Sequence, residues 1–198
     1  MIGCKNTSTN QSRIVKEMNI CLGEDKASLL NSLVDSFEDF LVRNHYAKDY
    51  NNITEGIDRY IDDVRLGIVP IDSLIHDKKK NSKLAKELTE LGFLKNKNGD
   101  NMTYNDLKNI DFLFYNLNGS PFFDPYTELL PCLKSANNNT VEFINYYLNQ
   151  KDTNGDLNIV IFAYDLQAGN RAEKYESKTI KEIIIIELYI GILLNNIE

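Results

Sequence analysis

The most metal-like string in the chain is Asp152-Thr153-Asn154-Gly155-Asp156-Leu157-Asn158, in which oxygen-bearing side chains alternate as in a calcium-binding loop. Such a loop also needs a glycine at its sixth position and a bidentate carboxylate at its twelfth, where this chain has Leu157 and Ala163. Both Asn-Gly-Asp triplets, at 98–100 and 154–156, are typical of tight turns, because Asn-Gly tolerates a positive φ at little cost. We therefore predict turns here, with no metal site and no cofactor.

Histidine-dependent hydrolysis needs an imidazole close to an activated serine or cysteine, and the chain has two histidines, His45 and His76. The sequence contains no Gly-x-Ser-x-Gly motif. We expect His45 at the C-terminal end of the first helix, where a positive imidazolium is favourable, and His76 in solvent within a polar stretch. No residue is therefore assigned a catalytic role.

Three carboxylates, Asp58, Asp62 and Asp63, fall within one face of a predicted helix. Acid–base hydrolysis uses two carboxylates set apart in a cleft. The spacing of Arg59 instead predicts ion pairs with Asp62 and Asp63, which is typical of an exposed charged face. We interpret this acidic face as part of a binding surface, and a hydrolase with a different carboxylate pair remains an alternative.

Aromatic residues are concentrated between positions 112 and 126. Phe122 and Phe123 are flanked by Pro121 and Asp124-Pro125, which predicts a loop. Aromatic side chains on loops are favoured in binding sites, although most of this segment is expected in the core. We therefore assign Phe122, Phe123 and Tyr126 to the predicted binding surface.

The charge balance narrows the class of partner. The chain has 22 lysine and arginine residues against 29 aspartate and glutamate residues, a formal net charge of -7. Such a surface repels nucleic acids and anionic membranes, so we predict a protein partner of basic charge and no nucleic-acid binding. The longest apolar stretch, 180–194, is shorter than a bilayer-spanning helix and contains two glutamates, which indicates a core segment.

The first residues, Met1-Ile2-Gly3-Cys4, precede a polar run from Lys5 to Ser12. Ile2, Gly3 and Cys4 resemble the last three positions of the lipobox of bacterial lipoproteins, although Met1 stands where that family usually has leucine. The resemblance implies that Cys4 is diacylated and becomes the mature N-terminus, and that the full-length gene encodes an apolar signal upstream of Ile2. The alternative is an unmodified tail on a cytoplasmic protein.

We expect residues 1–22 to form a flexible, hydrated tether. The segment Lys5-Asn6-Thr7 lacks the acidic residues with which some bacteria mark surface-exposed lipoproteins, which favours a periplasmic, membrane-anchored protein. Membrane contact would then occur only through the lipid on Cys4. Cys21 and Cys132 could form a disulfide in that compartment, or they could be two separate buried thiols.

Residues 23–198 are predicted to form a single, compact, mainly α-helical domain. Apolar periodicity and capping residues predict helices over 26–42, 54–66 (N-cap Thr54, end Gly67), 81–91, 103–114 (capping box Thr103 and Asp106), 126–133 and 139–148. The Lys78–Lys80 run is predicted to be a solvated loop. The segments 157–166 and 180–194 are almost uninterruptedly apolar, so periodicity cannot separate a buried strand from a buried helix. We expect helices, and the alternative is an α+β fold in which these two segments form a small two-stranded element.

These features predict a non-catalytic binding protein of the bacterial cell envelope, one form of which is an immunity-type inhibitor of a toxin or hydrolase. A hydrolase or a carrier of an apolar ligand are the alternatives, and both require a deep pocket. The inhibitor requires an acidic surface that a basic protein can reach.

The lipobox-like residues predict that Cys4 carries the lipid. The full-length protein should incorporate a metabolic fatty-acid probe in cells, and Cys4→Ala should abolish the label. Each buried methylene contributes about 0.8 kcal/mol, so several acyl chains would make attachment effectively permanent. An unlabelled wild-type protein would contradict the assignment.

Overall fold

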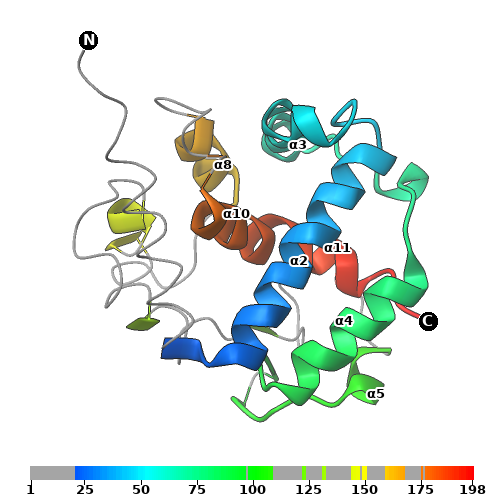
Figure 1. The fold of residues 1–198 in the computed structure, drawn as a ribbon, viewed down its shortest axis with the longest axis vertical. Coiled ribbons are helices and arrows are strands. Elements are labelled where there is room, and N and C mark those ends of the chain that lie inside the picture. The colour runs from blue at the N-terminus through cyan, green and yellow to red at the C-terminus, as the bar shows by residue number, and fades with distance from the viewer. Residues whose placement is uncertain are drawn as a thin grey trace.

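The computed structural model describes residues 21–96, 98–108, 122–123, 131–132, 144–147, 149–150, 159–167, 175 and 177–198. This part of the chain is mainly helical and packs around one core, as the sequence predicts. Figure 1 shows α2 running diagonally through the molecule, with α3 beside its C-terminal end and α4 and α5 on the opposite side. Helix α8 packs on α3.

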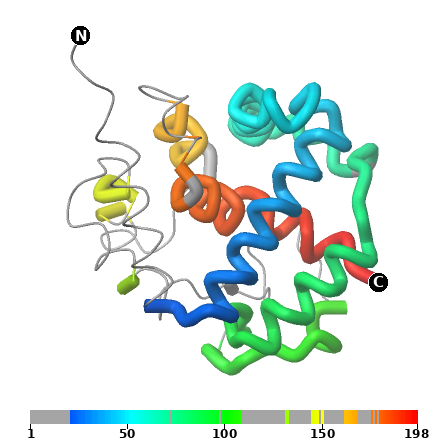
Figure 2. The backbone as a smooth tube through the Cα atoms, viewed as in Figure 1, coloured from blue at the N-terminus to red at the C-terminus, as the bar shows by residue number. Residues whose placement is uncertain are grey.

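In chain order the described elements are α2 (Glu24–Arg43), the 3-10 turn η1 (Tyr50–Asn52), α3 (Ile53–Leu66), the 3-10 turn η2 (Ile71–Ser73), α4 (Lys78–Glu90), β1 (Leu94–Lys95), α5 (Tyr104–Leu107), β2 (Phe122–Phe123), α8 (Ile159–Gln167), α10 (Lys178–Ile184), the π-helical segment η3 (Ile185–Tyr189) and α11 (Ile190–Leu194). The last three form one rod that crosses α2, and Figure 2 traces its continuous path.

The predicted helix over 26–42 is confirmed as α2, which begins two residues earlier and ends one residue later. Its leucines and phenylalanines recur at three- and four-residue steps, and Leu30, Leu33 and Phe37 are completely or almost completely buried. Acidic residues occupy the first turn and Arg43 the last, which is the arrangement that the helix dipole favours.

Helix α3 ends as predicted but begins earlier. Gly67 has a φ of 66°, and the amides of Gly67 and Ile68 donate to the carbonyls of the last turn. Thr54 is not the N-cap, because the preceding η1 turn already directs the chain into the helix at Ile53. The η1 turn is fixed by the Asp49 carboxylate, which accepts from the amide of Asn51 at 2.9 Å.

The lysine run at 78–80 forms the first turn of α4, so the prediction of a loop is wrong. Asp77 is the N-cap, and its carboxylate accepts from the amide of Lys80 at 3.0 Å. The periodicity of Leu84 and Leu88 could not locate this start, because the first turn contributes no apolar side chain to the core. The predicted capping box of Thr103 and Asp106 is confirmed at α5.

The described parts of both ambiguous apolar segments, 159–166 and 180–194, are helical, so the alternative in which the two segments form a two-stranded element is wrong. Each packs its apolar side chains on a neighbouring helix, α8 on α3 and the C-terminal rod on α2. The two-residue strands β1 and β2 pair antiparallel instead, with Leu94 opposite Phe123. Phe122 and Phe123 therefore lie in a strand and not in the predicted loop.

Five aromatic residues join the C-terminal rod to α2 and α3. The ring of Tyr189 lies 5.1 Å from that of Phe37 and 5.0 Å from that of Phe40, measured between centroids. Tyr60 meets the Phe40 ring edge-on at 5.7 Å, and Tyr46 in turn meets Tyr60 edge-on at 5.4 Å. We call Tyr46, Phe37, Phe40, Tyr60 and Tyr189 the aromatic cluster. Offset and edge-on contacts between rings stabilise a fold by more than the burial of their apolar area alone.

The folded domain begins no later than Cys21, two residues before the predicted boundary. Leu22 is only 7% exposed and belongs to the core. Cys21 is placed in a disulfide with Cys132, with a Cα–Cα distance of 5.7 Å, so the structure favours pairing over two separate thiols.

Among the described residues, no helix combines the length and apolarity needed to cross a bilayer. The tether prediction for residues 1–20 falls outside them.

The contact between α3 and the 44–49 connection gives a test of the packing. A Cβ added at Gly56 would lie 2.6 Å from the Cβ of Ala47, with backbone atoms of Ala47 at 3.0 and 3.1 Å. In an exposed helix, glycine to alanine stabilises by up to about 1 kcal/mol. Here Gly56→Ala should instead destabilise by about 1–3 kcal/mol, measured by urea unfolding. The neighbouring exposed Glu55→Ala is the control, and a stabilised Gly56→Ala protein would contradict the packing.

Candidate functional site

The acidic face lies on α3, but its carboxylates are bonded differently from the prediction. Arg59 pairs with Glu55 one turn earlier and not with Asp62 or Asp63, because an acidic residue four positions before a basic one is the favoured order on a helix. Asp62 instead pairs with Arg65 at 2.9 Å. The third carboxylate, Asp58, lies one turn before Asp62 and is half-buried.

Asp63 connects α3 to the segment that follows α2. Its carboxylate accepts from the hydroxyl of Tyr46 at 3.0 Å, and Tyr46 is otherwise buried in the aromatic cluster. Burial, and next the hydrogen bond to Asp63, raise the pKa of the Tyr46 hydroxyl, which therefore remains a donor at any physiological pH. Asp63 thus holds the fold together, while Asp58 and Asp62 border the outer surface.

Beside this face, α8 exposes two large apolar side chains. Ile161 is 57% and Tyr164 55% exposed, and they lie one turn apart. The Arg65 guanidinium lies 4.9 Å from the centre of the Tyr164 ring and donates to its hydroxyl at 3.2 Å. The sequence pattern did not single out these residues, because α8 is apolar from Ile159 to Tyr164 and this run shows no amphipathic period. The spacing of buried Phe162, Ala163 and Leu166 would have placed Ile161 and Tyr164 on the opposite side of the helix.

The predicted aromatic half of the surface is not joined to the acidic half. Phe122 and Phe123 pair with β1, which follows α4 at the far end of the molecule from α3 (Figure 1). Tyr126 lies outside the described residues. Within the described structure, the side chains that accompany Asp58 and Asp62 are therefore those of α8.

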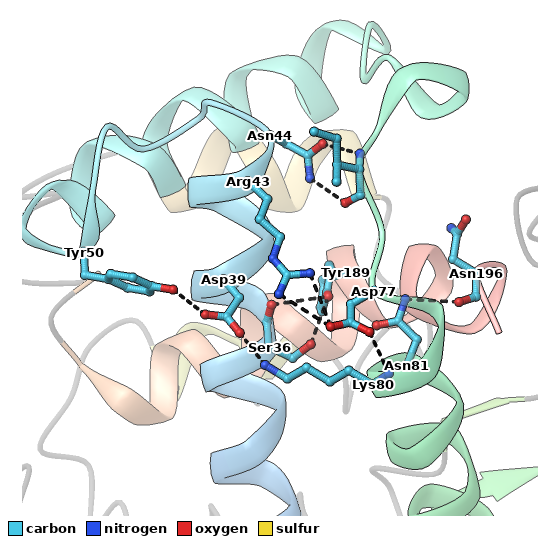
Figure 3. Close-up of polar contacts among 11 residues, drawn as sticks. Ser36, Asp39, Arg43, Asn44, Tyr50, Asp77, Lys80, Asn81, Tyr189 and Asn196 are labelled. Carbon is cyan, nitrogen blue, oxygen red and sulfur yellow. Dashed lines mark hydrogen bonds and ion pairs between the residues drawn. The ribbon is translucent and has the colours of Figure 1, made fainter. Parts of the chain in front are cut away.

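A polar hollow lies between α2, the start of α4 and the C-terminal rod, as Figure 3 shows. Asp39 accepts hydrogen bonds from Lys80 and from the hydroxyl of Tyr50, the latter at 2.5 Å. Arg43 donates to Asp77 at 3.4 Å. Two carboxylates thus face two cations, which keeps the hollow close to neutral.

The amides around the hollow are also bonded within the protein. Asn44 binds both backbone groups of Ile75, accepting from the N–H at 2.6 Å and donating to the carbonyl at 3.1 Å. Asn81 donates to the carbonyl of Asn196 at 3.2 Å, which connects α4 to the C-terminus. The space that water can occupy in the hollow is about 10 Å³, about enough for one molecule. The hollow is therefore a structural network and not a substrate pocket.

His76 lies beside this network, so the prediction of a solvent-exposed histidine is wrong. Its ring is half-buried and stacks on Phe40, with centroids 6.3 Å apart. Its Nε2 is buried and has no hydrogen-bond partner. Burial, and secondarily the charge of Lys78, lower the pKa of His76. By contrast, His45 is exposed just beyond α2, as predicted, with a φ of 60°.

Comparison with known proteins does not place the chain in a family. The chain matches no protein-family model, and neither a curated protein nor a solved structure is significantly similar to it.

The two Asn-Gly-Asp triplets are the most metal-like strings of the sequence, and one of them lies within the described residues. Among the described residues, histidine, cysteine and carboxylate side chains do not gather in groups of three that could hold a metal ion. The Asn98-Gly99-Asp100 triplet is a turn in which the Asn96 carboxamide oxygen accepts from the amides of Asn98 and Asp100. The second triplet, at 154–156, lies outside the described residues.

The lowered pKa of His76 predicts a pH-dependent stability. Since the folded state holds this proton less tightly than the unfolded chain, the free energy of unfolding should be constant above pH about 6.5 and fall as the pH drops below it. His76→Phe keeps a ring on Phe40 but cannot titrate, so it should remove this fall. His45→Gln should retain it. Urea unfolding between about pH 5 and 8 tests this, and identical profiles for the two variants would contradict it.

Proposed function

We propose that this chain is a non-catalytic binding protein of the bacterial cell envelope, anchored through Cys4, whose partner is a basic protein. An immunity-type inhibitor of a toxin or hydrolase is the form of this function that the charge and size favour. The observation that carries the envelope location is the pairing of Cys21 with Cys132, which is independent of the lipobox-like residues.

The cysteine pairing supports an exported protein. The disulfide joins two cysteines that are 111 residues apart in the sequence. In the chain-entropy model, a crosslink that closes a loop of this size stabilises the folded state by about 4–5 kcal/mol, because it restricts the unfolded chain. Disulfides persist in oxidising compartments such as the periplasm and are rare in the cytosol. A lipid on Cys4 would place the domain in the same compartment.

The distribution of charge supports a basic partner. Helix α3 has four carboxylates and two arginines, and α8 has one carboxylate and no cation, so these two helices together carry a net charge of -3. Helix α4, with five lysines and two glutamates, carries +3. The molecule is thus acidic at its α3–α8 end in addition to its overall charge of -7, which steers a cationic protein towards that end.

The alternatives of a hydrolase or an apolar-ligand carrier gain no support from the described residues. Both need a pocket that encloses much of a small molecule. The hollow beside Asp39 has room for about one water, and its polar groups bond one another.

The proposal predicts a stoichiometric complex in the cell envelope. Reversible crosslinking in intact cells of the source organism, followed by affinity purification and mass spectrometry, should recover one protein of net positive charge. Its complex with the purified domain should dissociate as the salt concentration rises towards about 1 M, where charge interactions are screened beyond roughly 3 Å. The same partner should be recovered with Cys4→Ala only if the protein is still exported. Recovery of an acidic protein, or a complex indifferent to salt, would contradict the proposal.

A further inference from the structure

We infer that the basic partner docks on the outer face of α3 and α8, with Ile161 and Tyr164 as its apolar anchors and Asp58 and Asp62 at its border. We call this the α3–α8 face. The inference rests on the proposed function for the sign of the partner's charge. It assigns the contact to a surface that the sequence pattern did not reveal.

The two anchors lie on α8, whose opposite side packs in the core. Phe162, Ala163 and Leu166 are buried in the core, so the opposite side of α8 must face outward. That side carries Ile161 and Tyr164, both more than half exposed. A tyrosine and a branched aliphatic residue one turn apart give a partner a compact apolar contact, and tyrosine is enriched at binding hot spots.

Tyr164 is held in place before any partner arrives. Asp62 accepts from Arg65 at 2.9 Å, and Arg65 both lies over the Tyr164 ring and donates to its hydroxyl. The Arg65 side chain is only 23% exposed, so this relay is partly shielded from solvent. Because an ordered side chain loses little conformational entropy on binding, the relay favours Tyr164 as an anchor.

The charge around these anchors selects the partner. With a net charge of -3 on α3 and α8, the face attracts a segment that combines cationic and apolar side chains. Asp165, the one carboxylate of α8, accepts a hydrogen bond from Tyr146, which fixes its position. The occupant we infer is therefore a basic, amphipathic segment of another protein.

A peptide of defined sequence can stand in for the partner in a binding test. The probe is a helical peptide of about 18 lysine and leucine residues with one apolar stripe, long enough to be helical on its own. Two comparison peptides replace every lysine by glutamate or every leucine by serine. In amide NMR spectra of the ¹⁵N-labelled protein, the lysine–leucine peptide should shift signals of α3 and α8, and the glutamate peptide should shift none. The serine peptide should bind at least about 10-fold more weakly.

Matched variants separate the face from general charge effects. Tyr164→Ala and Ile161→Lys should each weaken peptide binding by about 10-fold or more. Tyr50→Ala and Ile75→Lys are their controls, because Tyr50 is 61% and Ile75 54% exposed and neither residue belongs to α3 or α8. The control variants should bind within about 2-fold of wild type. All four positions are exposed, and thermal unfolding checks that each variant is folded.

Other results would overturn the inference in distinguishable ways. Peptide-induced shifts outside α3 and α8 would remove this face while leaving the proposed function standing. Equal losses in the test and control variants would show a charge effect without a defined site. Self-association of the protein alone that Ile161→Lys abolishes would make a second copy the occupant. No binding of any peptide up to about 1 mM would also refute the face, and crosslinking in cells would then decide the proposed function separately.

Discussion

The fold depends on the contact of one tyrosine of the C-terminal rod with two phenylalanines of α2. Tyr189 lies against Phe37 and Phe40, and its hydroxyl, at 3.3 Å from that of Ser36, is buried with them. Tyr189 ends a π-helical segment, where one backbone turn is widened. Tyr60 of α3 donates to the carbonyl of residue 188 in the same segment. Three helices are thus joined at one buried point, which satisfies polar groups that would otherwise be costly to bury.

The polar hollow adjoins this point, since Phe40 and Tyr189 both line it. Phe40 contacts Tyr189 and stacks with His76, and the 74–77 connection brings His76 there. Asp77 then starts α4, and the Asp39–Lys80 ion pair fastens that start to α2. Burial alone would raise the pKa of Asp39, but the bonds from Lys80 and Tyr50 outweigh it and lower the pKa. The network therefore orients α4 through ionised side chains that are paired with one another.

The sequence predicts those parts of the fold that local chemistry decides. Helix α2 is set by its apolar stripe, the end of α3 by Gly67 and the start of α5 by a capping box, and the structure confirms all three. The errors have a tertiary cause. Thr54 is an acceptable N-cap on its own, but the η1 turn starts the helix before it. Asp77 caps α4 at the point where the chain meets α2, because Arg43 of α2 donates to the Asp77 carboxylate. Phe122 pairs with a strand more than twenty residues earlier, a contact that no local pattern encodes.

The candidate site shows the same division. The acidic side of the α3–α8 face could be predicted, because Asp58 and Asp62 share a helix face. Their apolar companions could not, because α8 is apolar from Ile159 to Tyr164, and such a run does not reveal from composition which side faces outward. The Arg65–Tyr164 contact makes the two helices one surface, and α3 is itself fixed to the core through Tyr60 and the aromatic cluster. Since α8 buries its other side in the core and Arg65 of α3 lies over the Tyr164 ring, the orientation of Tyr164 is determined by the same packing that stabilises the fold. A partner therefore meets a surface that is already ordered.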